Sequence, residues 1–202
     1  MTLDRFRSLA DPILRPLVAG AARVGLGPNG VSVLAFLVAT GAGATFVLGG
    51  SEPLWYLLGA VLVAINGLLD LVDGALARRL DAASAAGDLL DHVLDRYADI
   101  VIVVGLAAGV DRYALGLAAV TGVLMTSYLG TQAQAVGVER VYGGVLGRAD
   151  RLALVGLAAA ATVLLPGPVS GLTVVGWLLV VFAVVGHATA LQRFYYAMRA
   201  LP

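Results

Sequence analysis

The residues of this sequence best suited to chemistry are four aspartates that recur at short intervals. Asp70 and Asp73 are three residues apart, and Asp91 and Asp95 are four apart. Each pair therefore shares one face of a predicted helix. Because only a short connection separates these helices, we expect them to be antiparallel neighbours with the four carboxylates at one depth. Carboxylates grouped in this way repel one another and therefore require cations.

The chemistry of these residues points to divalent cations and phosphate. Carboxylate oxygens are hard ligands that favour Mg²⁺, Mn²⁺ or Ca²⁺, and the absence of cysteine disfavours zinc. Gly74 and Gly87 remove side chains where a ligand can approach the backbone, and Ala77 keeps its face small. Arg78 supplies a positive charge for a phosphate. The pattern predicts transfer of a phosphoryl or phosphatidyl group assisted by two metal ions.

The segments that carry these aspartates are apolar enough to cross a membrane. The chain has 202 residues, of which 60% are hydrophobic and 13% charged, too few polar residues to coat a soluble domain. We therefore expect an all-α integral membrane protein that forms a single domain over residues 1–202. A spanning helix takes about 20 apolar residues. We expect six spans from the apolar stretches at about 31–48, 54–76, 89–110, 113–136, 152–165 and 169–191.

The remaining arginines and apolar residues predict how the bundle lies in the membrane. Residues 1–26 alternate arginines with apolar side chains, which predicts an amphipathic helix on the membrane surface before a six-span bundle over 27–195. Most arginines fall on one side of the predicted spans. The positive-inside rule then places both termini and the acidic cluster on the cytoplasmic side of the plasma membrane.

Composition and spacing bear on several other functions. Thirteen acidic residues balance 13 basic ones, so nucleic-acid binding is not expected. A divalent-cation transporter is the alternative from a different class, since membrane carboxylates also mark ion pathways. It predicts carboxylates near the bilayer midplane, whereas these lie toward the cytoplasmic ends of two spans. An intramembrane aspartyl protease is a third class, but it needs only one carboxylate pair. It therefore does not explain four aspartates together with Arg78 and the two glycines.

The acidic segment resembles the signature of the CDP-alcohol phosphotransferase (CDP-alcohol phosphatidyltransferase) family at all eight fixed positions. The matching run is Asp70-x2-Asp73-Gly74-x2-Ala77-Arg78-x8-Gly87-x3-Asp91-x3-Asp95. The resemblance implies a membrane enzyme of phospholipid biosynthesis. Such an enzyme transfers a substituted phosphate from a CDP-linked lipid donor to an alcohol and releases CMP. It also implies a homodimer that uses Mg²⁺ or Mn²⁺, with two ions in each site.

The resemblance further implies a role for each matching residue. The metal ligands would be Asp70, Asp73, Asp91 and Asp95, and Asp95 would also be the catalytic base that takes the proton from the attacking hydroxyl. The CDP moiety would bind residues of the signature and two neighbouring elements. These residues are Pro28, Asn29, Asp70, Asp73, Gly74, Ala77, Arg78, Ser84, Gly87 and Asp91.

Residues beyond the signature indicate the acceptor. The run from Asp95 through Arg96 to Asp99 resembles the phosphatidylinositol-phosphate and archaetidylinositol-phosphate synthases. By the same resemblance, a cationic pocket for the phosphate of a polyol phosphate such as inositol phosphate would come from the later arginines. These residues are Arg148, Arg151 and Arg193, together with Gln132.

One departure leaves the acceptor open. Gly130 and Gln132 stand where the inositol-phosphate synthases usually have lysine and arginine. Losing an arginine removes a bidentate phosphate contact. Glycerol phosphate, another polyol phosphate or an unphosphorylated alcohol therefore remain alternative acceptors.

Overall fold

The protein is helical throughout the part of the chain that the structure describes. The structure is a computed structural model, and it describes residues 7–138, 146–165 and 167–201. The helices within these ranges are α1 (Arg7–Arg23), α2 (Pro28–Gly49), α3 (Leu54–Arg79), α4 (Ala85–Gly109), α5 (Tyr113–Ala135), α6 (Arg148–Leu164) and α7 (Val174–Ala200). This confirms the prediction of an all-α protein.

Four of these helices are long and apolar enough to cross a membrane, namely α2, α3, α5 and α7. The two other predicted spans correspond to α4 and α6. Asp91, Asp95 and Asp99 place several charges along the first half of α4. Helix α6 has only 17 residues, fewer than the about 20 that a span takes. The multi-pass prediction is thus supported by four helices.

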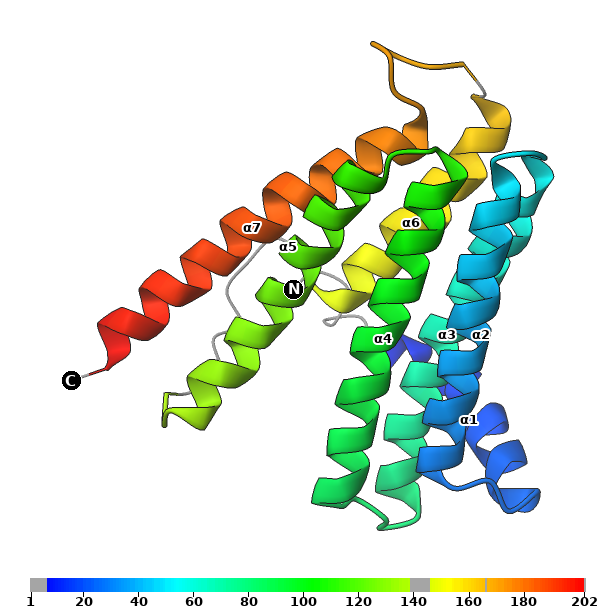
Figure 1. Cartoon of the computed structure of the whole chain (residues 1–202). Coiled ribbons are helices and arrows are strands. Elements are labelled where there is room, and N and C mark those ends of the chain that lie inside the picture. The colour runs from blue at the N-terminus through cyan, green and yellow to red at the C-terminus, as the bar shows by residue number, and fades with distance from the viewer. Residues whose placement is uncertain (1–6, 139–145, 166, 202) are drawn as a thin grey trace.

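The helices form two groups, joined by α6 and by the contact of α4 with α5 (Figure 1). Helix α2 packs against α3 and α4, α5 packs along α7, and α6 contacts both α3 and α7. The connections from α2 to α3 and from α4 to α5 lie at one end of the bundle. The connection from α3 to α4 lies at the opposite end, beside α1. This topology places the last turns of α3 and the first turns of α4 at the same end of the bundle. The two helices are not the direct neighbours that the short connection predicted, because each packs against α2.

Glycines allow the backbones of α2 and α4 to touch. A Cβ atom on Gly43 would lie 2.6 Å from the carbonyl oxygen of Val101, and Gly105 faces the backbone of Gly43 in turn. The buried side chains of Phe46 and Ile102 fill the space beside this contact. Small residues permit such close packing of membrane helices, and the result is a fixed position of α4 relative to α2.

Helix α1 buries one face against α3. Leu14 and Val18 are one turn apart and buried against Val72 and Leu76 of α3, whereas Arg15 is exposed. Helix α1 therefore braces the end of α3 from which the signature aspartates project.

Helix α7 begins later and ends later than the sequence predicts. Val169 and Leu172 form an isolated antiparallel bridge around Ser170 and Gly171, both with positive φ. This turn replaces the predicted first turn of the sixth span. The helix then begins at Val174, and its N-cap residue Thr173 accepts a hydrogen bond from the backbone of Gly176 at 3.1 Å.

Candidate active site

Three of the four signature aspartates converge between α3 and α4. One carboxylate oxygen from each of Asp70, Asp91 and Asp95 lies within 4.8 Å of the others. Helix α4 is fixed at its start by Ser84, the N-cap residue, whose hydroxyl accepts a hydrogen bond from the backbone of Gly87 at 3.1 Å. All three carboxylates are half-buried. The geometry suits a shared cation held by hard oxygen ligands.

The fourth aspartate lines the same cavity and also contacts α2. Asp73 is buried, and its Oδ2 accepts a hydrogen bond from the Ser32 hydroxyl at 2.9 Å. The carbonyl oxygen of Pro28, one turn earlier, lies 3.2 Å from the same hydroxyl and is the alternative acceptor for its single proton. The sequence analysis missed Ser32. The only signal available was its position one turn after Pro28 and Asn29.

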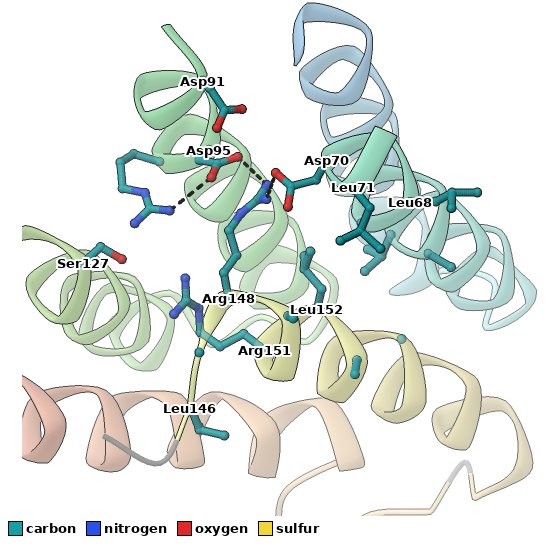
Figure 2. Close-up of a pocket in the computed structure, with 18 of the residues that line it drawn as sticks. Leu68, Asp70, Leu71, Asp91, Asp95, Ser127, Leu146, Arg148, Arg151 and Leu152 are labelled. Atoms are coloured by element: carbon teal, nitrogen blue, oxygen red, sulfur yellow. Dashed lines mark hydrogen bonds and ion pairs between the residues drawn. The ribbon is translucent and has the colours of Figure 1, made fainter. Parts of the chain in front are cut away.

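Arg148 reaches from the first turn of α6 to lie between two of these carboxylates (Figure 2). Its Nη1 is 2.5 Å from Oδ1 of Asp70, and its Nη2 is 2.8 Å from Oδ1 of Asp95. The start of α6 is fixed because the backbone N–H of Gly147 donates to the Asp150 carboxylate at 2.9 Å. Arg148 therefore joins α6 to both halves of the acidic cluster, and its positive charge neutralises part of it.

A second group of charges lies one turn further along α4. Asp99 is buried, and its Oδ2 accepts a hydrogen bond from Nη2 of Arg151 at 2.8 Å. Nη2 of Arg96 lies 3.5 Å from the same oxygen and 3.7 Å from Oδ2 of Asp95. These contacts connect the predicted base to the predicted acceptor pocket.

These charges line a cavity of about 1590 Å³ that has one polar and one apolar side. The polar side holds Asp70, Asp73, Asp91, Asp95, Arg78, Arg96, Arg148, Arg151 and Arg193, with Thr126, Ser127 and Thr131 of α5. The apolar side is formed by α3 and α6, through residues that include Leu57, Val61, Leu68, Leu152 and Leu157. Leu157 is 69% exposed, so the apolar side reaches the outer surface of the bundle. Such a cavity can accept a molecule with a charged head and apolar tails.

The residues predicted to bind CDP fall into three groups. Gly74 and Arg78 line the cavity together with Asp70, Asp73 and Asp91. Asn29, Ser84 and Gly87 meet beside it, because a Cβ on Gly87 would lie 3.0 Å from Oδ1 of Asn29 and 3.1 Å from the Ser84 hydroxyl. The remaining two predicted residues, Pro28 and Ala77, are on α2 and α3 outside the lining.

The predicted acceptor residues are also placed differently from one another. Arg148, Arg151 and Arg193 all line the cavity, and Nη1 of Arg193 donates to the carbonyl of Thr126 at 2.6 Å. Gln132 is exposed and does not belong to the lining. The turn of α5 that holds Gln132 contributes Gly130 and Thr131 to the cavity instead.

The chain is similar to one well-defined family. The sequence model described as CDP-alcohol phosphatidyltransferase matches residues 26–189. An archaetidylinositol phosphate synthase from Methanothermobacter thermautotrophicus is 32% identical, over 98% of this chain and 95% of the relative. A phosphatidylinositol phosphate synthase from Mycolicibacterium smegmatis is 35% identical, over 93% of this chain and 84% of the relative.

Solved structures are similar over the same extent. The crystal structure of Mycobacterium tuberculosis phosphatidylinositol phosphate synthase with CDP-DAG bound superposes with a TM-score of 0.79 at 27% identity. The match covers 92% of this chain and 94% of that one. The same enzyme in complex with manganese and citrate gives a TM-score of 0.79 at 26% identity, over 92% and 88% of the two chains.

Proposed function

This chain belongs to the CDP-alcohol phosphatidyltransferase family, and we propose that it transfers the phosphatidyl-type group of a CDP-linked lipid to inositol phosphate. The transferase activity and the release of CMP follow from the family. The observation that carries the proposal is the placement of three converging carboxylates in a cavity that is charged on one side and apolar on the other. A lipid with a nucleotide head group matches both sides.

The carboxylates are suited to divalent metal ions. We propose Mg²⁺ or Mn²⁺ as two ions held by Asp70, Asp73, Asp91 and Asp95. The manganese complex of the structural relative supports this choice, as does the all-oxygen donor set. When bound, the metal would neutralise the pyrophosphate of the donor and stabilise CMP as a leaving group. Ser32 holds Asp73 in place by its hydrogen bond.

The proposed reaction uses Asp95 as the base. The carboxylate of Asp95 takes the proton of an acceptor hydroxyl, whose oxygen attacks the phosphorus that carries the lipid. The bond between this phosphorus and the oxygen bridging to CMP breaks, and CMP leaves with the bonding electrons. Arg148 contacts both Asp70 and Asp95, so it stands next to the group that gains the proton.

The remaining binding residues divide between donor and acceptor. The CDP moiety is proposed to lie against Gly74 and Arg78, with Asn29, Ser84 and Gly87 at the nucleotide end. The lipid tails follow the apolar side formed by α3 and α6. Pro28 and Ala77 support the nucleotide end from neighbouring turns.

The acceptor assignment rests on charge and on the relatives. Two relatives are named for inositol phosphate lipids, and three arginines line the polar side of the cavity. Arginine suits this task because its planar guanidinium donates two parallel hydrogen bonds to phosphate oxygens. Gln132 is the weakest member of the proposed pocket, since it lies outside the lining.

We also infer the arrangement of the protein in its membrane. Helices α4 and α6 are proposed to cross the bilayer with α2, α3, α5 and α7, which gives six spans in one domain over residues 1–202. The site and both termini then face the cytoplasm, and α1 lies on the membrane surface. A homodimer completes the proposal, and native mass spectrometry of the protein in detergent tests it.

The deciding experiment is release of CMP by purified protein. The assay supplies a CDP-lipid with ester-linked or ether-linked tails, Mg²⁺, and separately inositol phosphate, glycerol phosphate, inositol, glycerol or serine. We expect release with inositol phosphate and a loss of about 10²-fold to 10⁴-fold in kcat for Asp95→Asn. Release with glycerol phosphate alone would reassign the acceptor. An Asp95→Asn protein with unchanged kcat would remove Asp95 as the base.

A further inference from the structure

Two arginines of the cavity share one buried carboxylate that the proposed reaction does not use. Asp99 of α4 accepts from Nη2 of Arg151 on α6 at 2.8 Å, and Nη2 of Arg96 lies 3.5 Å from the same oxygen. The side chain of Asp99 is 5% exposed and that of Arg151 is 7% exposed. Asp99 therefore holds guanidinium groups from two helices next to each other.

The surrounding charges favour an anion beside this pair. Among the described contacts, the carboxylates that face Arg96 are Asp99 and Asp95, and the one that faces Arg151 is Asp99. Asp95 is also a proposed metal ligand. Once a divalent ion neutralises Asp95, Asp99 alone balances two guanidinium groups. The excess positive charge then attracts an anion.

The hydrogen bonds of the arginines lead to the same conclusion independently. The Nε atoms of Arg96 and Arg151 are buried, and neither has a hydrogen-bond partner within the described part of the chain. Leaving a charged donor unsatisfied is costly. Both side chains line the cavity, and phosphate oxygens are well-matched acceptors for guanidinium groups.

We infer that Arg96 joins Arg151, already a member of the predicted acceptor pocket, in one clamp for the phosphate of the acceptor, with Asp99 as the positioning residue that holds both. This inference rests on the proposed function in one respect, that the acceptor carries a phosphate. Arg96 also lies 3.7 Å from Asp95. The clamp therefore sets the bound phosphate at a fixed place relative to the base.

Steady-state kinetics with variants of each member test the clamp. We expect Arg96→Gln to raise the KM for inositol phosphate about tenfold, the usual scale for losing a charged hydrogen bond. The KM for the CDP-lipid should stay within about twofold of wild type. Arg79→Gln is the matched control, because Arg79 is exposed at the end of α3 and is not part of the lining. It should leave both constants unchanged.

A second set of variants separates positioning from folding. Asp99→Asn leaves Arg151 buried without its carboxylate, so Asp99→Glu is made beside it to retain the charge. We expect Asp99→Glu to recover part of the acceptor KM lost in Asp99→Asn. The double variant Asp99→Asn with Arg96→Gln should lose less than the two single losses combined, because the residues act together. Equal acceptor KM values in Arg96→Gln, Asp99→Asn and wild type would overturn the clamp.

A binding measurement keeps this test separate from the acceptor assignment. Calorimetry of Mg²⁺-loaded protein with inorganic phosphate requires no turnover. If wild type proves to use only unphosphorylated alcohols, the proposed acceptor fails, and phosphate binding alone decides the clamp. Weaker binding by Arg96→Gln than by wild type and Arg79→Gln supports the clamp, and equal binding by all three refutes it.

Discussion

Nη1 of Arg148 lies 2.5 Å from Oδ1 of Asp70, which joins the first turn of α6 to the end of α3. The guanidinium thereby supplies positive charge at the place where the carboxylates converge. A divalent ion bound there must compete with this charge, because like charges in a partly buried site repel strongly.

Removing the charge of Arg148 should therefore strengthen metal binding while it weakens catalysis. We expect Arg148→Gln to lower the Kd for Mn²⁺ by about tenfold, equivalent to about 1.4 kcal/mol. The KM for inositol phosphate should rise, since the same residue is proposed to bind the acceptor. Titration of Mn²⁺ followed by electron paramagnetic resonance measures the first effect. The competition is excluded if Arg148→Gln binds Mn²⁺ no more tightly than wild type and Arg79→Gln.

The hydrogen bond from Ser32 to Asp73 should matter for both stability and metal affinity. Ser32→Ala leaves a buried carboxylate with one donor fewer, which costs about 1–3 kcal/mol. We expect a lower Tm and weaker Mg²⁺ binding, measured by thermal unfolding in detergent with and without the ion. Ser51→Ala is the control, because the Ser51 hydroxyl is exposed and bonds only locally to the Leu48 carbonyl. Equal Tm values for the two variants would contradict the proposed role of Ser32.

The contact between Gly43 and the Val101 carbonyl should tolerate no added methyl group. Because the Cβ of Gly43→Ala would lie 2.6 Å from that oxygen, α2 and α4 must separate, at a cost of about 1–3 kcal/mol. Gly41→Ala is the matched control on the same helix, since its Cβ would lie 3.6 Å from the flexible Leu62 side chain. Thermal unfolding should show a lower Tm for Gly43→Ala only. A similar Tm for both would show that the helices adjust freely.

Gly130 should determine where Arg193 lies. A Cβ on Gly130 would be 2.9 Å from Nη1 of Arg193. This Nη1 donates to the carbonyl of Thr126, which precedes Gly130 by one turn of α5. We expect Gly130→Ala to displace the guanidinium and raise the acceptor KM several-fold. Gly156→Ala also alters the cavity lining, but its nearest neighbour would be 3.9 Å away. Its acceptor KM should equal that of wild type, and a matching rise in Gly156→Ala would refute the explanation.

The sequence predicted the acidic cluster because the residues that form it are close in the chain. Helical spacing predicted that Asp91 and Asp95 share a face, and the short link between α3 and α4 predicted that Asp70 lies at the same end of the bundle. The three carboxylates do converge. The spacing also grouped Asp73 with them, and Asp73 lines the same cavity. The spacing did not predict the hydrogen bond that Asp73 accepts from Ser32, 41 residues earlier. That partner depends on how α2 packs against α3, which no local pattern encodes.

Contacts between distant helices were the least predictable part of the site. Asp99 and Arg151 are 52 residues apart in the chain. Taken alone, each is as typical of an ordinary charge at the membrane edge as of a functional residue.

The start of α7 was misplaced for a different reason. Val169 extends the apolar stretch, but the positive φ values of Ser170 and Gly171 end any helix there.

The two halves of the site belong to different stages of synthesis. The acidic half comes from one hairpin, α3 and α4, whereas Arg148 follows about fifty residues after Asp95, which at about 5–20 residues per second is a delay of several seconds. During that interval Asp70 is without Arg148, and among the described contacts Arg96, 3.7 Å from Asp95, is the guanidinium already present beside the cluster. The order of translation therefore leaves part of the negative charge to cellular cations until α6 is made.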